Sequence, residues 1–182
     1  MEKDFQHFVE CLKEAGARIE EHYFKLREAG SEEQIYRERV YCYEIYHQLR
    51  NALGNNFRYE LDGELDKRGH EIIQGDQKPD FVVHEPGTMD RNLVVIEVKP
   101  VTVTVQKLEK DLCKLKGFLD RAEYYRAIIL IYGDGDQAAK LQQVKSLAQE
   151  YDQRIIVIWH KGHGETPIEV SLDRKTNHSG EG

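Results

Sequence analysis

The first half of the chain shows the hydrophobic periodicity of helices. In residues 4–28, apolar side chains recur at steps of three and four, which predicts an amphipathic helix. Gly30 ends this helix, and Ser31, followed by two glutamates, is typical of a helix N-cap with an acidic first turn. A second helix is therefore predicted over 32–53, where Gly54 and two asparagines stop it.

The second half alternates between strand patterns and helical patterns. Helices are predicted over 105–123 and 136–151. Strands are predicted over 57–61, 81–83, 93–98, 127–132 and 154–159, with a ragged strand near Ile72 and Ile73. The run 93–98 is almost continuously apolar, as expected for a central strand that is buried on both faces.

This element order predicts an α/β protein. Strands that alternate with helices imply parallel crossovers, so we expect a central mixed β-sheet flanked by helices on both faces. A chain of 182 residues suits one domain. We expect an N-terminal helix in residues 1–30 appended to an α/β core over 31–160, and a polar, partly flexible tail over 161–182.

The composition bears on the location of the protein and on its class. No apolar run approaches the ~18 residues that a membrane span needs, and the first residues contain no apolar leader. The three cysteines are scattered and lack CxxC spacing, which favours a reducing, cytoplasmic location. The net charge of −7 argues against a protein that coats nucleic acid by charge alone. This net charge does not exclude an enzyme that contacts DNA through a local basic face and a bound divalent metal.

The candidate chemistry lies where two neighbouring strands meet. Glu97 and Lys99 end the apolar strand two residues apart, so their side chains share one face. Charged groups buried at such a place are costly unless they are paired or bind a metal. Asp80 opens the preceding strand, and a hairpin over 80–99 would bring it beside Glu97. A simpler interpretation makes Asp80 a turn residue and the other two a surface pair on an edge strand.

Two carboxylates at the edge of a sheet can hold a hard divalent cation through oxygen. Such a cation polarises a phosphate and lowers the pKa of a water, and a nearby lysine can stabilise the developing negative charge. These parts suffice for phosphodiester hydrolysis.

The residues Pro79-Asp80 and Glu97-Val98-Lys99 resemble the motif of the PD-(D/E)xK nuclease superfamily. The element order over 32–132 is also similar to the restriction-endonuclease-like core of that family. The chain resembles uncharacterised bacterial members of the family in particular. The resemblance implies that Asp80 and Glu97 bind Mg²⁺ or Mn²⁺ and that Lys99 is catalytic. Pro100, directly after the lysine, departs from the usual pattern.

The resemblance extends to two further positions. Similar proteins look like this chain around Glu38 and Arg39, and they carry an Asp…Lys-Leu element on the helix after the motif. Here that element consists of Asp111 and the pair Lys114-Leu115.

The family usually adds an acidic residue from its first core helix. Glu38 interrupts the buried stripe of the predicted helix and is favoured as a third metal ligand and catalytic residue. Glu44 lies on a polar stripe, which is expected to face solvent. Glu64, near a strand before the motif, is a further acidic candidate for the metal shell.

Basic and aromatic residues suggest how nucleic acid could be held. Lys107, Lys110 and Lys114 recur at helical spacing and could contact phosphates, but a solvated face paired with neighbouring acidic residues is at least as good an interpretation. Four tyrosines on the second predicted helix could stack on bases, although packing within the protein is favoured for them. They are Tyr36, Tyr41, Tyr43 and Tyr46.

The sequence therefore predicts metal-dependent phosphodiester hydrolysis of nucleic acid, with DNA as the first choice of substrate. The alternative is a nuclease-fold module for binding or assembly that does not cleave. We expect nucleic acid as the partner and no membrane contact. Whether the chain forms a homodimer or needs an accessory protein is left open by the sequence.

Overall fold

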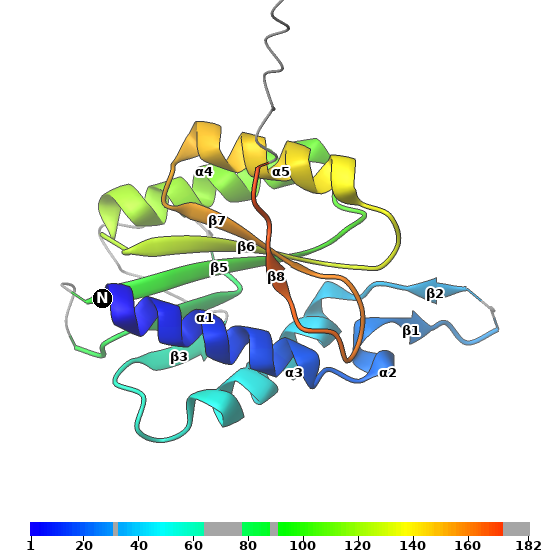
Figure 1. Cartoon of the computed structure of the whole chain (residues 1–182), viewed down its shortest axis with the longest axis horizontal. Coiled ribbons are helices and arrows are strands. Elements are labelled where there is room, and N and C mark those ends of the chain that lie inside the picture. Colours follow the sequence, from blue (N-terminus) through cyan, green and yellow to red (C-terminus); the bar gives the residue numbers. More distant parts are fainter. Residues whose placement is uncertain (31–32, 64–77, 88–90, 173–182) are drawn as a thin grey trace, which may run out of the picture.

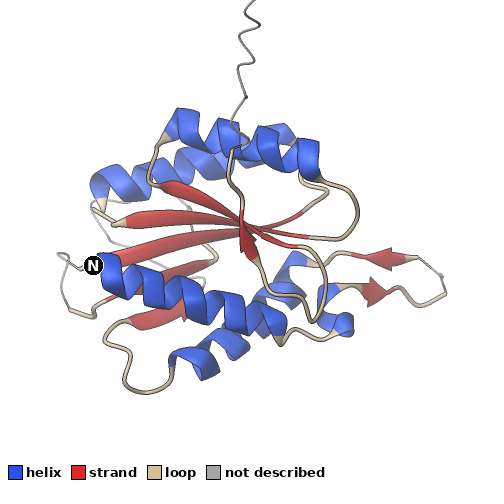
Figure 2. Ribbon diagram, in the orientation of Figure 1, coloured by secondary structure: helices blue, strands red, loops and turns tan. Residues whose placement is uncertain are grey.

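The computed structural model describes residues 1–30, 33–63, 78–87 and 91–172, and it has α/β architecture with helices on both faces of one sheet (Figures 1 and 2). The six-stranded sheet contains, in spatial order, β3 (Glu60–Gly63), β4 (Phe81–His84), β5 (Asn92–Pro100), β6 (Arg126–Tyr132), β7 (Ile155–His160) and β8 (Ile168–Glu169). The helices are α1 (Glu2–Ala17), α2 (Glu21–Phe24), α3 (Glu38–Leu53), α4 (Val105–Arg121) and α5 (Ala138–Tyr151).

The sheet is mixed, as predicted. Strands β3, β4 and β5 pair antiparallel, whereas β5, β6 and β7 pair parallel through the crossover helices α4 and α5. Strand β8 adds an antiparallel edge next to β7. The predicted α/β class with a helix-flanked mixed sheet is therefore confirmed.

Two hydrophobic cores lie on opposite faces of the sheet. Helices α1 and α3 cover one face, and α4 and α5 cover the other (Figure 1). Strand β5 contributes to both cores, because Val94 and Ile96 point to the α1/α3 side while Val95 points to the α4/α5 side. All three side chains are fully buried. This two-sided burial explains why the sequence of β5 is an apolar run rather than an alternating pattern.

The N-terminal helix is shorter than predicted. It ends at Ala17 instead of continuing to residue 28, and α2 and β1 (Leu26–Arg27) follow it. At its end, Gly16 packs so closely against Pro167 that a side chain there would overlap the proline ring. The carbonyl of Ile19 accepts a hydrogen bond from the Gly164 N–H at 3.1 Å. The chain leaves the helix to make these distant contacts, which helical periodicity cannot reveal.

The second predicted helix also begins later, at Glu38 rather than at residue 32. The residues before it form β2 (Gln34–Ile35), which pairs antiparallel with β1 in a two-stranded ribbon that projects from the body of the protein (Figure 1). Tyr36 follows this ribbon, and its hydroxyl donates a 2.6 Å hydrogen bond to Asp134. The predicted cap at Ser31, the ragged strand near Ile72 and the acidic candidate Glu64 lie outside the described residues.

Within the described ranges, no helix is long and apolar enough to cross a membrane. The region predicted as a tail contributes β8 to the sheet before residue 173.

Substitution of Gly133 is expected to destabilise the fold. Its φ of +144° is unusual for an L-residue, and a Cβ there would overlap Val101. We expect Gly133→Ala to lower the free energy of unfolding by about 2–4 kcal/mol, since backbone strain and overpacking add. Gly135→Ala is the matched control, because its φ is +89° but the nearest atom to a Cβ is 3.4 Å away. It should lose only about 1 kcal/mol. Equal losses in urea denaturation would contradict a packing role for Gly133.

Candidate active site

Asp80 and Glu97 are brought together by the β4–β5 pairing. Phe81 pairs with Ile96, so Asp80, one residue before, lies beside Glu97 at the end of the hairpin. The carboxylate of Asp80 accepts a 2.7 Å hydrogen bond from the backbone N–H of Val98. Asp80 is thus fixed against β5, in the position that the predicted hairpin required.

Glu97 and Lys99 lie on a central strand. Strand β5 runs between β4 and β6, and the side chains of Glu97 and Lys99 are only 1% and 11% exposed. The interpretation of these two residues as a surface pair on an edge strand is therefore wrong. A buried carboxylate and ammonium must instead be compensated within the protein.

The ammonium of Lys99 lies among four carboxylates from four separate elements or loops. It donates a 3.0 Å hydrogen bond to Glu38, the first residue of α3. The other three carboxylates lie slightly farther from Nζ: Glu97 at 3.6 Å, Asp111 at 3.7 Å and Asp80 at 3.8 Å. The structure thus places Glu38, the favoured helix residue, together with the motif residues.

Helix α4 supplies the second cation of the cluster. The ammonium of Lys114 lies 2.6 Å from Oε1 of Glu97 and 3.6 Å from Asp111, and it donates to the Lys78 carbonyl at 3.1 Å. Lys114 is therefore engaged inside the site, whereas Lys107 and Lys110 on the same helix are exposed. The helix presents one turn, Asp111 to Lys114, toward the strand end.

Glu44 does not reach this cluster in the contacts of the described residues. It is 8% exposed rather than on a solvent-facing stripe, and it accepts a 2.6 Å hydrogen bond from Gln48 on its own helix. His47 lies 3.4 Å from its other oxygen. Glu44 is thus held within α3, away from Lys99.

Carboxylates outnumber ammonium groups in the cluster. The side chains of Glu38, Asp80, Glu97 and Asp111 surround the ammonium groups of Lys99 and Lys114.

Burial and the neighbouring charges shift the pKa values of several groups in the cluster. Burial, and next the charge of Asp80, raises the pKa of Glu97 to about 8. Burial also raises the pKa of Glu38, although Lys99 opposes the shift. Burial alone would lower the pKa of Lys99, but the surrounding carboxylates, led by Asp80, outweigh it and raise the pKa. Lys99 therefore stays protonated at neutral pH.

The donor set has the chemistry of a site for a hard cation. Its ligands are carboxylate oxygens, which suit Mg²⁺ and Mn²⁺, and no histidine is in the cluster. Oε1 of Glu97 is fully buried and, apart from its ion pair with Lys114, accepts no hydrogen bond from the described residues. As the side chains are arranged, no three His, Cys, Asp or Glu residues in the described ranges converge as a metal-binding group. The Lys99 ammonium lies among the carboxylates instead.

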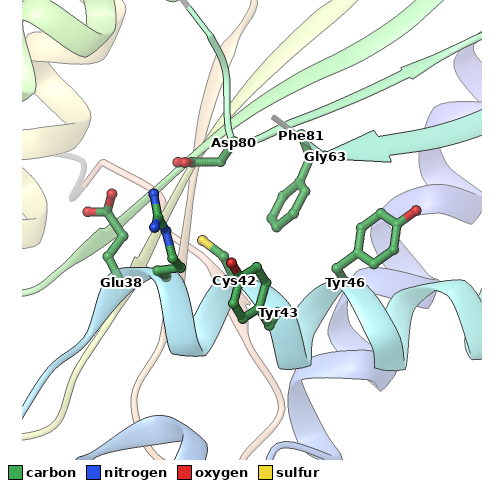
Figure 3. Close-up of a pocket in the computed structure, with 8 residues that line it drawn as sticks. Glu38, Cys42, Tyr43, Tyr46, Gly63, Asp80 and Phe81 are labelled. Carbon is green, nitrogen blue, oxygen red and sulfur yellow. The ribbon is translucent and has the colours of Figure 1, made fainter. Parts of the chain in front are cut away.

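Two hollows open beside the cluster, and Glu38 lines both. The first, here called the aromatic hollow, has a volume of about 430 Å³ (Figure 3). It is lined by Glu38, Arg39, Cys42, Tyr43, Tyr46, Gly63, Asp80 and Phe81. The second, here called the lysine hollow, has a volume of about 340 Å³. It is lined by Glu38, Lys99, Pro100, Thr102, Val103, Thr104, Lys107, Lys110 and Asp111.

Spacing alone did not single out two participants. The sequence places Asp111 in an Asp…Lys-Leu element but does not identify it as a neighbour of Lys99, and the cysteine spacing does not place Cys42 beside the cluster. Cys42 lines the aromatic hollow, where burial and then the charge of Asp80 raise the pKa of its thiol. It is thus not activated as a nucleophile. The three-residue step from Asp111 to Lys114 was the available signal for a shared helix face.

The fold and the site together define an α/β protein with an acidic, lysine-containing cluster at the end of a central strand. In comparisons with family models, with curated proteins and with solved structures, nothing matches this chain.

Proposed function

We propose that the protein is a metal-dependent nuclease of the PD-(D/E)xK type, with a restriction-endonuclease-like core, that hydrolyses phosphodiester bonds in nucleic acid, with DNA as the first candidate substrate. The observation that carries the proposal is the convergence of the carboxylates of Asp80, Glu38 and the buried Glu97 on one strand end, beside open hollows. A divalent cation would offset the negative charge of these carboxylates.

Asp80, Glu97 and Glu38 would hold Mg²⁺ or Mn²⁺. Bound there, the ion would supply a polarised phosphate and a water of lowered pKa. The side chains contribute the rest. Lys99 remains protonated, so it acts as a cation that stabilises negative charge on the phosphate rather than as a base. Lys114 partly neutralises Glu97 and, through the Lys78 carbonyl, fixes α4 beside the segment before Asp80.

A binding module without cleavage activity is the second candidate. It is favoured by the net charge of −7 and by the engagement of Lys99 and Lys114 in ion pairs within the protein. A cluster whose lysines already pair with its carboxylates can persist as a structural network.

Metal binding separates these candidates. We expect Mn²⁺ to bind the wild-type protein in isothermal titration calorimetry and Asp80→Asn to weaken binding by about tenfold or more, since it removes a charged ligand. Asp120→Asn is the matched control, because Asp120 is an exposed acidic residue of α4 that pairs with Lys116.

The activity itself is tested on single-stranded, double-stranded and branched DNA and on RNA, with Mg²⁺ or Mn²⁺. Cleavage that stops in EDTA and returns with excess Mn²⁺ would support the nuclease. Absence of both metal binding and cleavage would leave the binding module.

A further inference from the structure

The aromatic hollow contains a tyrosine that the fold does not use for packing. Tyr43 on α3 is 64% exposed, the highest value among the large hydrophobic side chains in the described ranges. The other tyrosines of this helix are engaged. Tyr41 is fully buried and stacks on Tyr132 with ring centroids 4.0 Å apart, and the Tyr46 hydroxyl donates to the Leu61 carbonyl at 3.1 Å.

The hollow has two chemically different ends. The carboxylates of Glu38 and Asp80 lie at one end, and the rings of Phe81 and Tyr46 lie toward the other (Figure 3). The centroids of these two rings lie 6.0 Å apart, with an interplanar angle of 27° between the rings. Arg39 and Tyr43, four residues apart on α3, both line the hollow. A volume of about 430 Å³ lies within the range of roughly 300–1,000 Å³ for ligand pockets.

We propose that the aromatic hollow receives an unpaired nucleobase adjoining the phosphate at the carboxylate cluster, so that the substrate is single-stranded or locally unpaired nucleic acid. This inference rests on the proposed function. A flat base could stack on the exposed ring of Tyr43 beside the aromatic side chains of Tyr46 and Phe81, and base–aromatic stacking is independent of sequence. A base inside a duplex has both faces stacked on its neighbours and must leave the helix to enter such a pocket.

The lysine hollow on the other side of Glu38 complements this arrangement. It offers two exposed ammonium groups, Lys107 and Lys110, and the hydroxyls of Thr102 and Thr104, and none of its lining residues in the described ranges is aromatic. Such groups suit phosphate and sugar oxygens rather than bases. A strand that crosses Glu38 would therefore place a base on the aromatic side and its backbone on the lysine side.

The test measures binding and stacking without requiring cleavage. Fluorescence anisotropy in EDTA compares a labelled single-stranded oligonucleotide with the duplex of the same sequence. We expect Tyr43→Ala to weaken single-strand binding by about tenfold, as loss of one stacking contact implies, with a much smaller change for the duplex. Tyr43→Phe keeps the ring and should bind as the wild type does. Ile168→Ala is the control for loss of an exposed apolar side chain, since Ile168 is 54% exposed on the distant edge strand β8.

Two further measurements make the inference specific. The fluorescence of a strand that contains 2-aminopurine should change on binding the wild type and not Tyr43→Ala. Lys107→Met combined with Lys110→Met should weaken single strand and duplex alike and reduce the salt dependence, because these lysines would contact phosphates.

The outcomes distinguish this inference from the nuclease proposal. Equal single-strand binding by wild type and Tyr43→Ala overturns the base pocket, whether or not the protein cleaves. Binding and stacking that depend on Tyr43 support the base pocket even if the protein cleaves with neither Mg²⁺ nor Mn²⁺. In that case the nuclease proposal fails and the base pocket stands.

Discussion

Lys99→Met is expected to reduce metal-dependent cleavage by about 10²–10³-fold, the usual loss when a group that stabilises transition-state charge is removed. Lys99 is 11% exposed, lies within 4 Å of four carboxylates and lines the lysine hollow. Methionine approximates its length without the charge. Cleavage rates at saturating Mn²⁺ measure the effect. The control variant is Lys116→Met, which should cleave at the wild-type rate. Lys116 is a half-exposed lysine of α4 that pairs with Asp120.

A loss of activity must be separated from a loss of folding. Lys99→Met leaves four carboxylates with one ammonium, so its fold has to be checked by circular dichroism. Asp80→Asn provides an independent variant, because it removes one carboxylate from a cluster rich in carboxylates and keeps an oxygen that can accept from the Val98 N–H. It should fold at least as well as the wild type and still lose cleavage. Wild-type rates in either folded variant would refute the assigned roles.

Glu97→Gln is expected to stabilise the protein at alkaline pH, with an effect that grows between pH 5 and 8. In the unfolded chain a glutamate loses its proton near pH 4.3, about the ordinary value. In the folded protein, burial and Asp80 raise the pKa of Glu97 to about 8. The folded state therefore binds the extra proton in this window, and wild-type stability falls as pH rises through it. At pH 8 the neutral amide should be more stable on the order of 3 kcal/mol, with little difference near pH 5.

Urea denaturation from pH 5 to 8.5, without divalent metal, measures this effect. Glu10→Gln, a substitution of an exposed glutamate on α1, is the control and should not alter the slope of stability against pH. Mn²⁺ should restore wild-type stability at pH 8 and have little effect on Glu97→Gln, because the ion compensates the carboxylate that the variant lacks. Identical pH slopes for wild type and Glu97→Gln would contradict a strained carboxylate at this position.

Both predictions follow from one structural feature. Asp80 precedes β4, Glu97 and Lys99 lie near the end of the paired strand β5, and Glu38 and Asp111 approach the same point from helices. A buried carboxylate with a raised pKa lowers stability at pH values above its ordinary pKa, and such perturbed groups cluster at functional sites.

The sequence alone determined the central part of this picture. Strand β5 was recognisable because burial on both faces requires an apolar run, and the two-residue period of a strand places Glu97 and Lys99 side by side. Asp80 was placed correctly because antiparallel pairing of neighbouring strands is a local event. The mixed sheet and its crossover helices followed from the order of the patterns, because strands that alternate with helices pair parallel through crossover connections.

Only the tertiary structure decided what the helices contribute. Glu38 and Glu44 are six residues apart on one helix, and the packing of α3 brings Glu38 to Lys99 while Glu44 remains with Gln48. The docking of α4 likewise turns Lys114 toward Glu97 and leaves Lys107 exposed. Periodicity identifies the buried face of a helix, but its position along and around the sheet depends on side-chain packing between distant segments. Contacts such as Gly16 with Pro167, which accompany the early end of α1, have the same long-range origin.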